Sequence, residues 1–273
     1  MLLKLIGIPL VYQTYHSGID HAIRLRTKVF RKNDNLFATK VLAVSERVRL
    51  DEIRAGVASN LIETMYLGIS LKDFEGENLI LQGRDPVGWN DPNIKKIITV
   101  GRFYSEKGMR YVVEAAIQVL KSRDNVVWWL VGKQGPESAY CDQIILESHM
   151  HDCIDCLGQR NDIPALMKGC DLQVVGSIYE GFGLMVLEAA ACNVPTVGTQ
   201  IGGMDEAILD GITGLLVERC DSHALAAATH WMLDHPGQRD LMGAAARQHV
   251  VEKFNAEIQI KILLKKFEMD LYA

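Results

Sequence analysis

Residues 95–217 alternate between short apolar runs and amphipathic segments, and this alternation constrains the fold more than any other feature of the sequence. The runs IITV (97–100) and WWLV (128–131) are almost entirely apolar. Strands of a parallel sheet that is covered on both faces read as continuous apolar runs, whereas half-exposed strands alternate. The pattern therefore predicts an α/β fold, with a parallel sheet between two layers of helices.

The order of expected elements is regular in this part of the chain. The predicted strands are KKIITVG, NVVWWLVG, CIDCLG, DLQVVGS, VPTVGTQ and GLLVE, and helical segments separate them. Upstream, LIGIPLVYQTYH (5–16) and KVLAVS (40–45) are expected strands, and Ser45 is expected to cap a helix that begins at Glu46. Residues 75–93 are rich in Gly, Pro, Asn and Asp, which is typical of a linker.

Composition excludes several classes of protein. The net charge of −5 does not suggest general affinity for nucleic acid. Six cysteines in 273 residues, without a secretory leader, indicate reduced thiols and not a disulfide framework. The apolar N-terminal stretch is short and is interrupted by Pro9, so it predicts a buried strand and not a membrane span. We therefore expect a cytoplasmic protein.

Ligands of such sheets bind at the carboxyl ends of the strands, so the loops that follow the strands are informative. Arg102 and Lys107 follow the first strand of the regular part, and two cations at this position suit a diphosphate. On this motif alone, two solvated charges are an equally good interpretation. The loop LGQRND (157–162), with Gln159 and Arg160, offers backbone groups to a flat base edge, or it is a turn in which Asp162 caps the next helix.

The stretch EGFG (180–183) opens a helix that carries a second carboxylate, Glu188. Bare N–H groups at a helix start attract phosphate. Glu188 would lie roughly 7 Å along the helix, which suits a ribose next to that phosphate. Glu180 would then reach a sugar on the other side. GxGxxG and GxxxxGK[ST] patterns are missing, so a nicotinamide or P-loop site is disfavoured.

These motifs together resemble one family. E-GFGLMVL-E, with seven residues between the acids, is similar to the signature of the family-4 retaining glycosyltransferases. VGRFYSEKG, LGQRND and IGGMDEAILDGITGLLVE resemble that family in the same order, from Ile97 to about Phe254. The resemblance implies a GT-B-type fold of two Rossmann-like domains, in which the C-terminal domain holds a UDP- or GDP-linked sugar as donor, with no cofactor and no metal.

The resemblance also implies roles for particular residues. Glu180 contacts the donor sugar, as ligand or as nucleophile, and we favour the ligand role; Glu188 binds the ribose. His16, at the end of an N-terminal strand, faces the sugar, although a surface histidine is the alternative. The other implied donor-binding residues are Arg102, Lys107, Gln159, Arg160, Gly181, Phe182, Gly183, Leu184 and Met185.

The N-terminal part resembles the family only in part. Residues 1–88 would be the second half of a Rossmann-like domain, 89–254 the complete nucleotide-sugar domain, and 255–273 a helix that packs toward the N-terminal part. Leu67 stands where the family usually has Asn. Half a sheet leaves an uncovered edge, so we expect a partner chain or dimer, a truncated form or a reshaped domain.

Several alternatives stay open at this point. The chain is a sugar transferase that acts on a sugar or lipid-linked acceptor, or a nucleotide-sugar-binding subunit that needs a partner; an epimerase is disfavoured by the spacing of the two acids. HxHxCxxC (149–156) resembles a zinc site, but Cys153 and Cys156 are expected to diverge on a strand. The basic helix 24–32 is expected to be a solvated face; binding to anionic lipid at the inner membrane surface is the alternative.

Overall fold

The computed structural model describes residues 12–15, 40–76 and 81–272. The chain forms two compact units, 1–69 with 253–273, and 70–252. Each unit is described below by itself.

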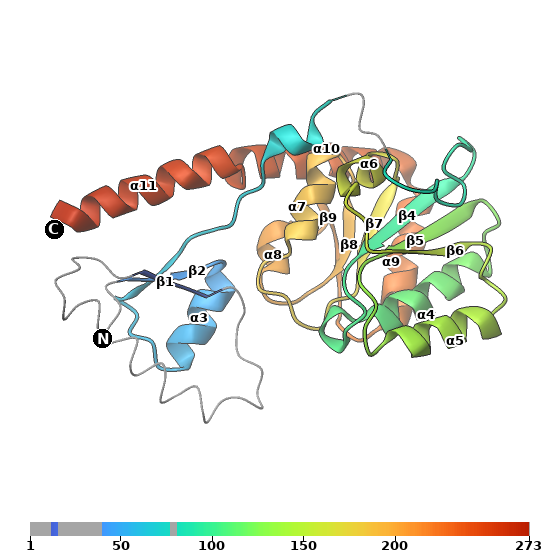
Figure 1. The fold of residues 1–273 in the computed structure, drawn as a ribbon, viewed down its shortest axis with the longest axis horizontal. Coiled ribbons are helices and arrows are strands. Elements are labelled where there is room, and N and C mark those ends of the chain that lie inside the picture. Colours follow the sequence, from blue (N-terminus) through green and yellow to red (C-terminus); the bar gives the residue numbers. More distant parts are fainter. Residues whose placement is uncertain (1–11, 16–39, 77–80, 273) are drawn as a thin grey trace. The chain divides into compact units, whose positions relative to one another are not determined.

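The second unit contains one parallel sheet of six strands (Figure 1). The strands are β4 (Lys95–Val100), β5 (Val126–Val131), β6 (Ile154–Gly158), β7 (Leu172–Val175), β8 (Thr196–Thr199) and β9 (Gly214–Val217). Their order in the sheet is β6-β5-β4-β7-β8-β9, and every neighbouring pair is parallel. The predicted parallel α/β sheet is confirmed.

Helices cover both faces of this sheet, and two adjacent tryptophans show why. Trp128 belongs to a core cluster with α4 (Met109–Leu120), α5 (Ser138–Glu147) and α9 (Ser222–Asp234). Trp129 belongs to a second cluster with α6 (Ile163–Lys168) and α7 (Leu184–Ala191). Neighbouring residues of a strand point to opposite faces, so a continuous apolar strand fills both cores. The chain then continues through α8 (Met204–Ala207) and α10 (Pro236–Lys253).

The strand order reverses between β4 and β7, which makes their junction the topological switch point of the sheet. A hydrogen-bond chain crosses this junction in the core. The Trp128 indole donates to the Thr99 hydroxyl (3.0 Å), and that hydroxyl donates to the Val174 carbonyl (2.8 Å). In sheets of this type, ligands bind in the crevice outside the carboxyl ends of the two strands at the switch point.

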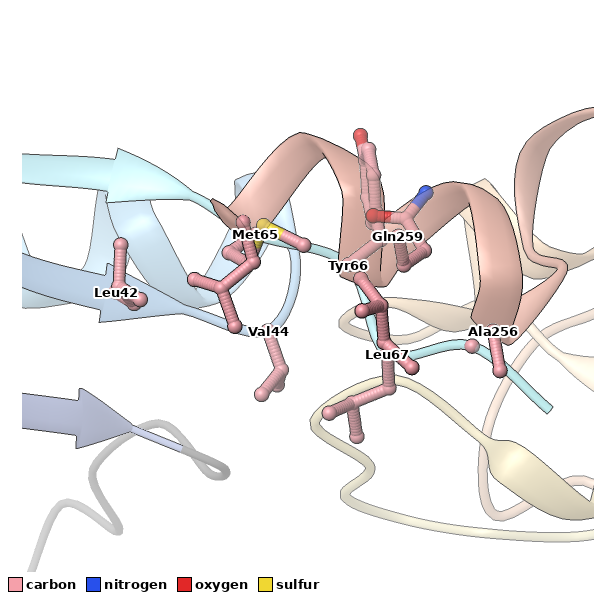
Figure 2. Close-up of a pocket in the computed structure, with 10 residues that line it drawn as sticks. Leu42, Val44, Met65, Tyr66, Leu67, Ala256 and Gln259 are labelled. Atoms are coloured by element: carbon pink, nitrogen blue, oxygen red, sulfur yellow. The ribbon is translucent and has the colours of Figure 1, made fainter. Parts of the chain in front are cut away.

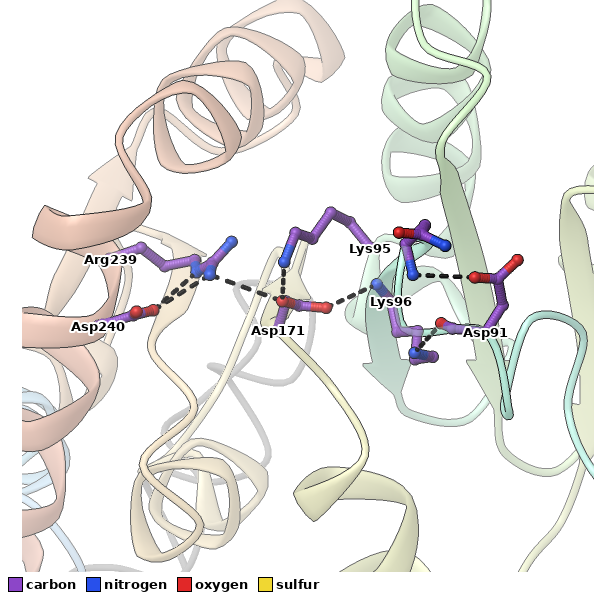
Figure 3. Close-up of polar contacts among 7 residues, drawn as sticks. Asp91, Lys95, Lys96, Asp171, Arg239 and Asp240 are labelled. Carbon is purple, nitrogen blue, oxygen red and sulfur yellow. Dashed lines mark hydrogen bonds and ion pairs between the residues drawn. The ribbon is translucent and has the colours of Figure 1, made fainter.

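The amino ends of the same two strands are held by a polar network (Figure 3). Asp171, next to β7, accepts hydrogen bonds from Lys95 Nζ and from the Lys96 backbone N–H, both at 3.0 Å. The largely buried Arg239 of α10 lies 3.5 Å from the same carboxylate and also pairs with Asp240. The network fixes β4 against β7 at the end of the sheet opposite to the crevice.

The first unit contains a parallel sheet of β1 (Tyr12–Tyr15), β2 (Lys40–Ala43) and β3 (Ile62–Thr64), in that order. Helix α3 (Glu46–Arg54) follows β2. The Ser45 hydroxyl accepts from the Val48 N–H at 3.1 Å, which confirms the predicted cap.

Helix α11 (Ala256–Tyr272) belongs to the first unit although it lies far along the chain. Glu63 of β3 pairs with Lys266 of α11 and with Lys40 of β2. The hydrogen bond from Lys266, followed by that from Lys40, lowers the pKa of Glu63. A one-residue parallel bridge between Ile69 and Asn255 joins the two ends of the unit.

The limits of the compact units differ from the domain limits expected from the sequence in the placement of residues 70–88. The 3-10 helix Leu71–Phe74 and the stretch 81–88 belong to the second unit. Arg84 and the Val87 N–H bind the Asp155 carboxylate, and Trp89 packs on Trp129 with 5.5 Å between ring centroids. This part of the expected linker is therefore fastened to the sheet of the second unit.

Among the helices of the described residues, none combines the length and the apolar character that crossing a lipid bilayer requires.

Candidate functional site

Two loops at the switch point are joined by their backbones. Glu106, in the loop after β4, accepts hydrogen bonds through its carbonyl from the N–H groups of Ile178 (2.9 Å) and Tyr179 (3.2 Å), in the loop after β7. Gly108 has φ +59, and a Cβ there would stand 1.9 Å from the carbonyl oxygen of Gly176. Glycine is therefore required where the two loops meet, and the loops form one support for their side chains.

The loops bring Lys107 and Glu180 together. Lys107 Nζ lies 2.5 Å from Glu180 Oε2, and each side chain is 15% exposed. Arg102, on the same loop as Lys107, has a different environment. Its side chain is 59% exposed, and its guanidinium lies 3.3 Å from Glu106 and over the Tyr104 ring. One cation of the predicted pair is thus held against a carboxylate, and the other faces solvent.

The start of α7 completes this side of the crevice. Gly183 forms the N-cap with φ +89, and no side chain of the described residues caps the helix. Gly181, Phe182 and Gly183 are buried, whereas Leu184 is 40% exposed. The N–H groups of an uncapped first turn are available to an anion.

The first turn of α7 is anchored from beneath. Gln173 of β7 donates its side-chain amide to the Met185 carbonyl at 3.1 Å, and it accepts from the Thr196 hydroxyl of β8 at 2.8 Å. Gln173 is fully buried. Strand β7 therefore fixes the direction in which the helix start points.

A third loop, directly before α8, supports the turn that carries Glu180. A Cβ at Gly202 (φ +52) would stand 2.1 Å from the Glu180 carbonyl oxygen, and one at Gly203 would stand 2.4 Å from the Gly181 carbonyl oxygen. These two glycines were not among the residues predicted for the site. Their signal in the sequence is IGG immediately before MDEA.

Replacing Gly202 with alanine is expected to displace this turn and to weaken binding of an anionic ligand at the helix start by about tenfold or more. Gly211→Ala is the matched control, because Gly211 also has positive φ (+72) but has no atom within 4 Å of the added Cβ. The control should show only the cost of the left-handed backbone, about 1–2 kcal/mol. Equal loss of binding in both variants, measured by calorimetry, would contradict the packing argument.

Glu188 lies on α7 and is half-buried. Burial raises the pKa of its carboxyl group to about 7. No described residue makes a hydrogen bond to this carboxylate. A largely desolvated acid without a partner is well suited to bind hydroxyl groups of a ligand.

The loop after β6 has its polar side chains in two different situations. Gln159 is exposed. Arg160 is 7% exposed and makes two hydrogen bonds to Asp162 (2.8 and 2.6 Å) and one to the Arg84 carbonyl (3.0 Å). The side chain of Arg160 is thus committed to residues of the protein, and what this loop offers to a ligand is its backbone and Gln159.

Asp162 occupies the N-cap position of α6, but its carboxylate does not cap that helix. It accepts instead from Arg160 and from the Gln82 N–H at 2.6 Å, and the hydrogen bond from Arg160 lowers its pKa. The alternative interpretation of this turn as a side-chain cap is wrong, because the fastened stretch that contains Gln82 provides a better partner.

Residues 87–249 match the family model described as glycosyl transferases group 1. The chain belongs to this family. N-acetyl-alpha-D-glucosaminyl L-malate synthase of Bacillus anthracis is 34% identical over 163 residues, which are 60% of this chain and 42% of that protein. Alpha-D-kanosaminyltransferase of Streptomyces kanamyceticus is 26% identical over 270 residues, 93% of this chain and 69% of that one. The chain thus spans less than half the length of the first of these relatives.

Solved structures have the same architecture. Anabaena Alr3699/HepE, in complex with UDP and glucose, superposes with a TM-score of 0.86 at 21% identity, over 97% of this chain and 73% of that one. The C-terminal domain of LpcC, a group 1 glycosyl transferase from Francisella tularensis, superposes with a TM-score of 0.60 at 26% identity, over 69% of this chain and 99% of that one. The expected GT-B-like fold is confirmed.

Some of the sequence predictions concern residues that the structure does not describe, and another concerns a cysteine pair. His16 and the basic segment 24–32 lie outside the described residues. Cys153 precedes β6, and both Cys153 and Cys156 pack against the same core cluster, so the expectation that they diverge is wrong. In the described part of the chain, no three His, Cys, Asp or Glu residues are grouped as metal ligands would be.

The first unit has an apolar pocket of about 280 Å³ (Figure 2). Val44 and Met65 directly follow β2 and β3, so the pocket lies at the carboxyl ends of these strands, and α11 contributes its other side. Leu67 is part of the lining. The remaining lining residues are Leu42, Tyr66, Gly68, Ala256, Gln259, Ile260 and Leu263.

Proposed function

We propose that this glycosyl transferase moves a sugar from a nucleoside diphosphate sugar to an acceptor, with retention of the anomeric configuration. The observation that carries the proposal is the arrangement at the switch point. A largely buried lysine, an uncapped helix start and two carboxylates, Glu180 and Glu188, lie on the loops and the helix that follow β4 and β7. The donor would bind along this line.

In the proposed complex, the diphosphate binds to Lys107, Arg102 and the N–H groups at Gly183, Leu184 and Met185. These groups neutralise the charge that develops on the leaving diphosphate, so the proposed reaction uses no metal ion. The ribose hydroxyls donate to Glu188, and the base edge meets the backbone of the 157–162 loop and Gln159.

Glu180 would accept hydrogen bonds from hydroxyls of the donor sugar. We favour this ligand role over a nucleophilic role; in the ligand-free protein the carboxylate is paired with Lys107. The departing diphosphate and nearby backbone groups would then stabilise the oxocarbenium-like charge on the face from which the leaving group departs. We keep His16 as a second proposed catalytic residue.

The acceptor side is proposed more coarsely. Of a sugar acceptor and a lipid-linked acceptor, the apolar pocket of the first unit favours the lipid-linked one. We also propose that a partner chain or a second copy covers the sheet of the first unit. A cytoplasmic enzyme with peripheral contact to the inner membrane surface would suit such an acceptor.

A thermal-shift series tests the donor site with UDP, GDP and ADP, each alone and as its glucose ester. The nucleotides that carry one of the three bases are expected to raise the Tm of the protein by about 4 °C or more when their concentration is about 100-fold above Kd. Lys107→Met should remove the shift, and Lys121→Met, which changes an exposed lysine after α4, should retain it. No shift with any nucleotide would contradict a functional donor site. A shift without sugar transfer would favour the nucleotide-sugar-binding subunit.

A further inference from the structure

Lys107 and Glu180 satisfy each other before any ligand arrives. Their atoms lie 2.5 Å apart, each side chain is 15% exposed, and neither makes another side-chain hydrogen bond within the described residues. The backbone bonds from Ile178 and Tyr179 to Glu106 hold the two loops at this separation. A ligand that takes one partner therefore leaves the other without one.

Arg102 shows that the pair is not needed merely to place a cation at the crevice. Its side chain is 59% exposed, and its ion pair with Glu106 is longer, at 3.3 Å. An incoming phosphate can bind Arg102 at little cost, because the ion pair between Arg102 and Glu106 is exposed to solvent and therefore weak. To bind Lys107, the same phosphate must compete with the Glu180 carboxylate.

An intact nucleotide sugar and the nucleoside diphosphate that remains after transfer (the spent nucleotide) differ in the hydrogen-bond donors that they offer to Glu180. The diphosphate of either ligand can take Lys107. Only the intact donor also brings sugar hydroxyls, which can donate to the released carboxylate. After the sugar has been transferred, the nucleoside diphosphate leaves Glu180 desolvated, unpaired and close to a negatively charged ligand, which is unfavourable.

We propose that the Lys107–Glu180 ion pair is a specificity device that discriminates the intact donor from the spent nucleotide. It opens for a ligand that offers both an anion and hydroxyl donors, and it re-forms to expel a ligand that offers the anion alone. The proposal rests on the function proposed above, since it requires nucleotide binding at this crevice. It adds that Glu180 weakens binding of the product as well as holding the substrate.

Calorimetric titration tests this device with the nucleoside diphosphate that binds the unchanged protein and with its glucose ester. Glu180→Gln removes the competing charge, so it should tighten binding of the nucleoside diphosphate about tenfold. Affinity for the glucose ester should change much less, because the variant also loses a charged acceptor for the sugar. The Kd of the nucleoside diphosphate divided by the Kd of its glucose ester should therefore fall about tenfold.

Glu106→Gln is the matched control. It removes the carboxylate beside Arg102 but leaves the backbone carbonyl that joins the two loops. It should leave the ratio of dissociation constants unchanged.

The outcomes separate the two proposals. Nucleotide binding by the unchanged protein, with equal or weaker binding by Glu180→Gln, would overturn the discriminating role and leave the proposed function intact. No nucleotide binding by the unchanged protein would overturn both. If near-UV circular dichroism shows that Glu180→Gln is misfolded, Glu180→Asp takes its place. This variant keeps the negative charge but increases the distance between the carboxylate and Lys107. The proposal requires that it lower the same ratio, by a smaller factor.

Discussion

Replacing Glu180 with glutamine is expected to slow sugar transfer by at least about a hundredfold. The substitution keeps the size of the side chain, but it removes the charge that would hold the sugar hydroxyls and orient the anomeric carbon toward the acceptor. Misplacing the reacting group costs rate even when the ligand remains bound. Sugar transfer should be slow although the nucleoside diphosphate still binds. The variant should bind the nucleoside diphosphate more tightly than the unchanged protein does.

The measurement is single-turnover transfer with the donor above its Kd, which separates the chemical step from product release. Glu106→Gln should transfer at close to the normal rate, because its carboxylate lies beside the exposed Arg102. Full activity of Glu180→Gln would remove this residue from the site. Rescue by added azide or formate would instead indicate the nucleophilic role that we disfavour.

Glu188→Gln is expected to have two effects of opposite sign. It should weaken binding of the nucleotide about tenfold to a hundredfold, because an amide is a poorer acceptor for two ribose hydroxyls than a carboxylate. It should also stabilise the ligand-free protein at pH 8 by about 1–3 kcal/mol, because it removes a charge that is costly to bury. If Glu188 served only to stabilise the fold, its replacement would not weaken nucleotide binding and stabilise the ligand-free protein at the same time.

The raised pKa of Glu188 determines how the stability of the folded protein changes with pH. Burial raises the pKa of Glu188 to about 7 in the folded protein, above the ordinary value of 4.5. The folded state therefore holds the proton more tightly than the unfolded state, and stability is lost as pH rises from about 4.5 through 7. The advantage of Glu188→Gln should be largest at pH 8 and should fade toward pH 4.5.

Urea unfolding at several pH values measures this difference. Glu147→Gln is a suitable control, since that glutamate is exposed on α5. Its stability should differ little from that of the unchanged protein at any pH. A Glu188→Gln protein that is less stable at pH 8 would show that the carboxylate has a stabilising partner in the fold.

Local signals in the sequence were sufficient for most of the fold. The six strands of the second unit and the Ser45 cap follow from apolar runs and one hydroxyl residue in the right place. The loops of the candidate site could be located from the sequence, because the carboxyl ends of parallel strands share one edge; the roles of their residues stay predictions. Arg102 and Lys107 could be named from their place after a strand, whereas the roles of Glu180 and Glu188 came from their spacing within a family resemblance.

What the sequence did not reveal depends on contacts between distant segments. Lys107 and Glu180 are 73 residues apart, and their pairing results from two loops that meet at Gly108 and Gly176. Asp162 has a cap position by sequence, but Gln82, 80 residues away, takes its carboxylate. The support that Gly202 gives to Glu180 likewise arises from a loop after a different strand.

The composition of the first unit has a consequence for the order of folding. The second unit is one continuous stretch, 70–252, whereas the first unit combines 1–69 with 253–273. During synthesis the chain emerges from its N-terminal end, so the second unit can complete its sheet while α11 is still being made. Lys266 cannot pair with Glu63 until then. Residues 40–69 therefore leave the ribosome before the second unit but acquire their packing against α11 after it.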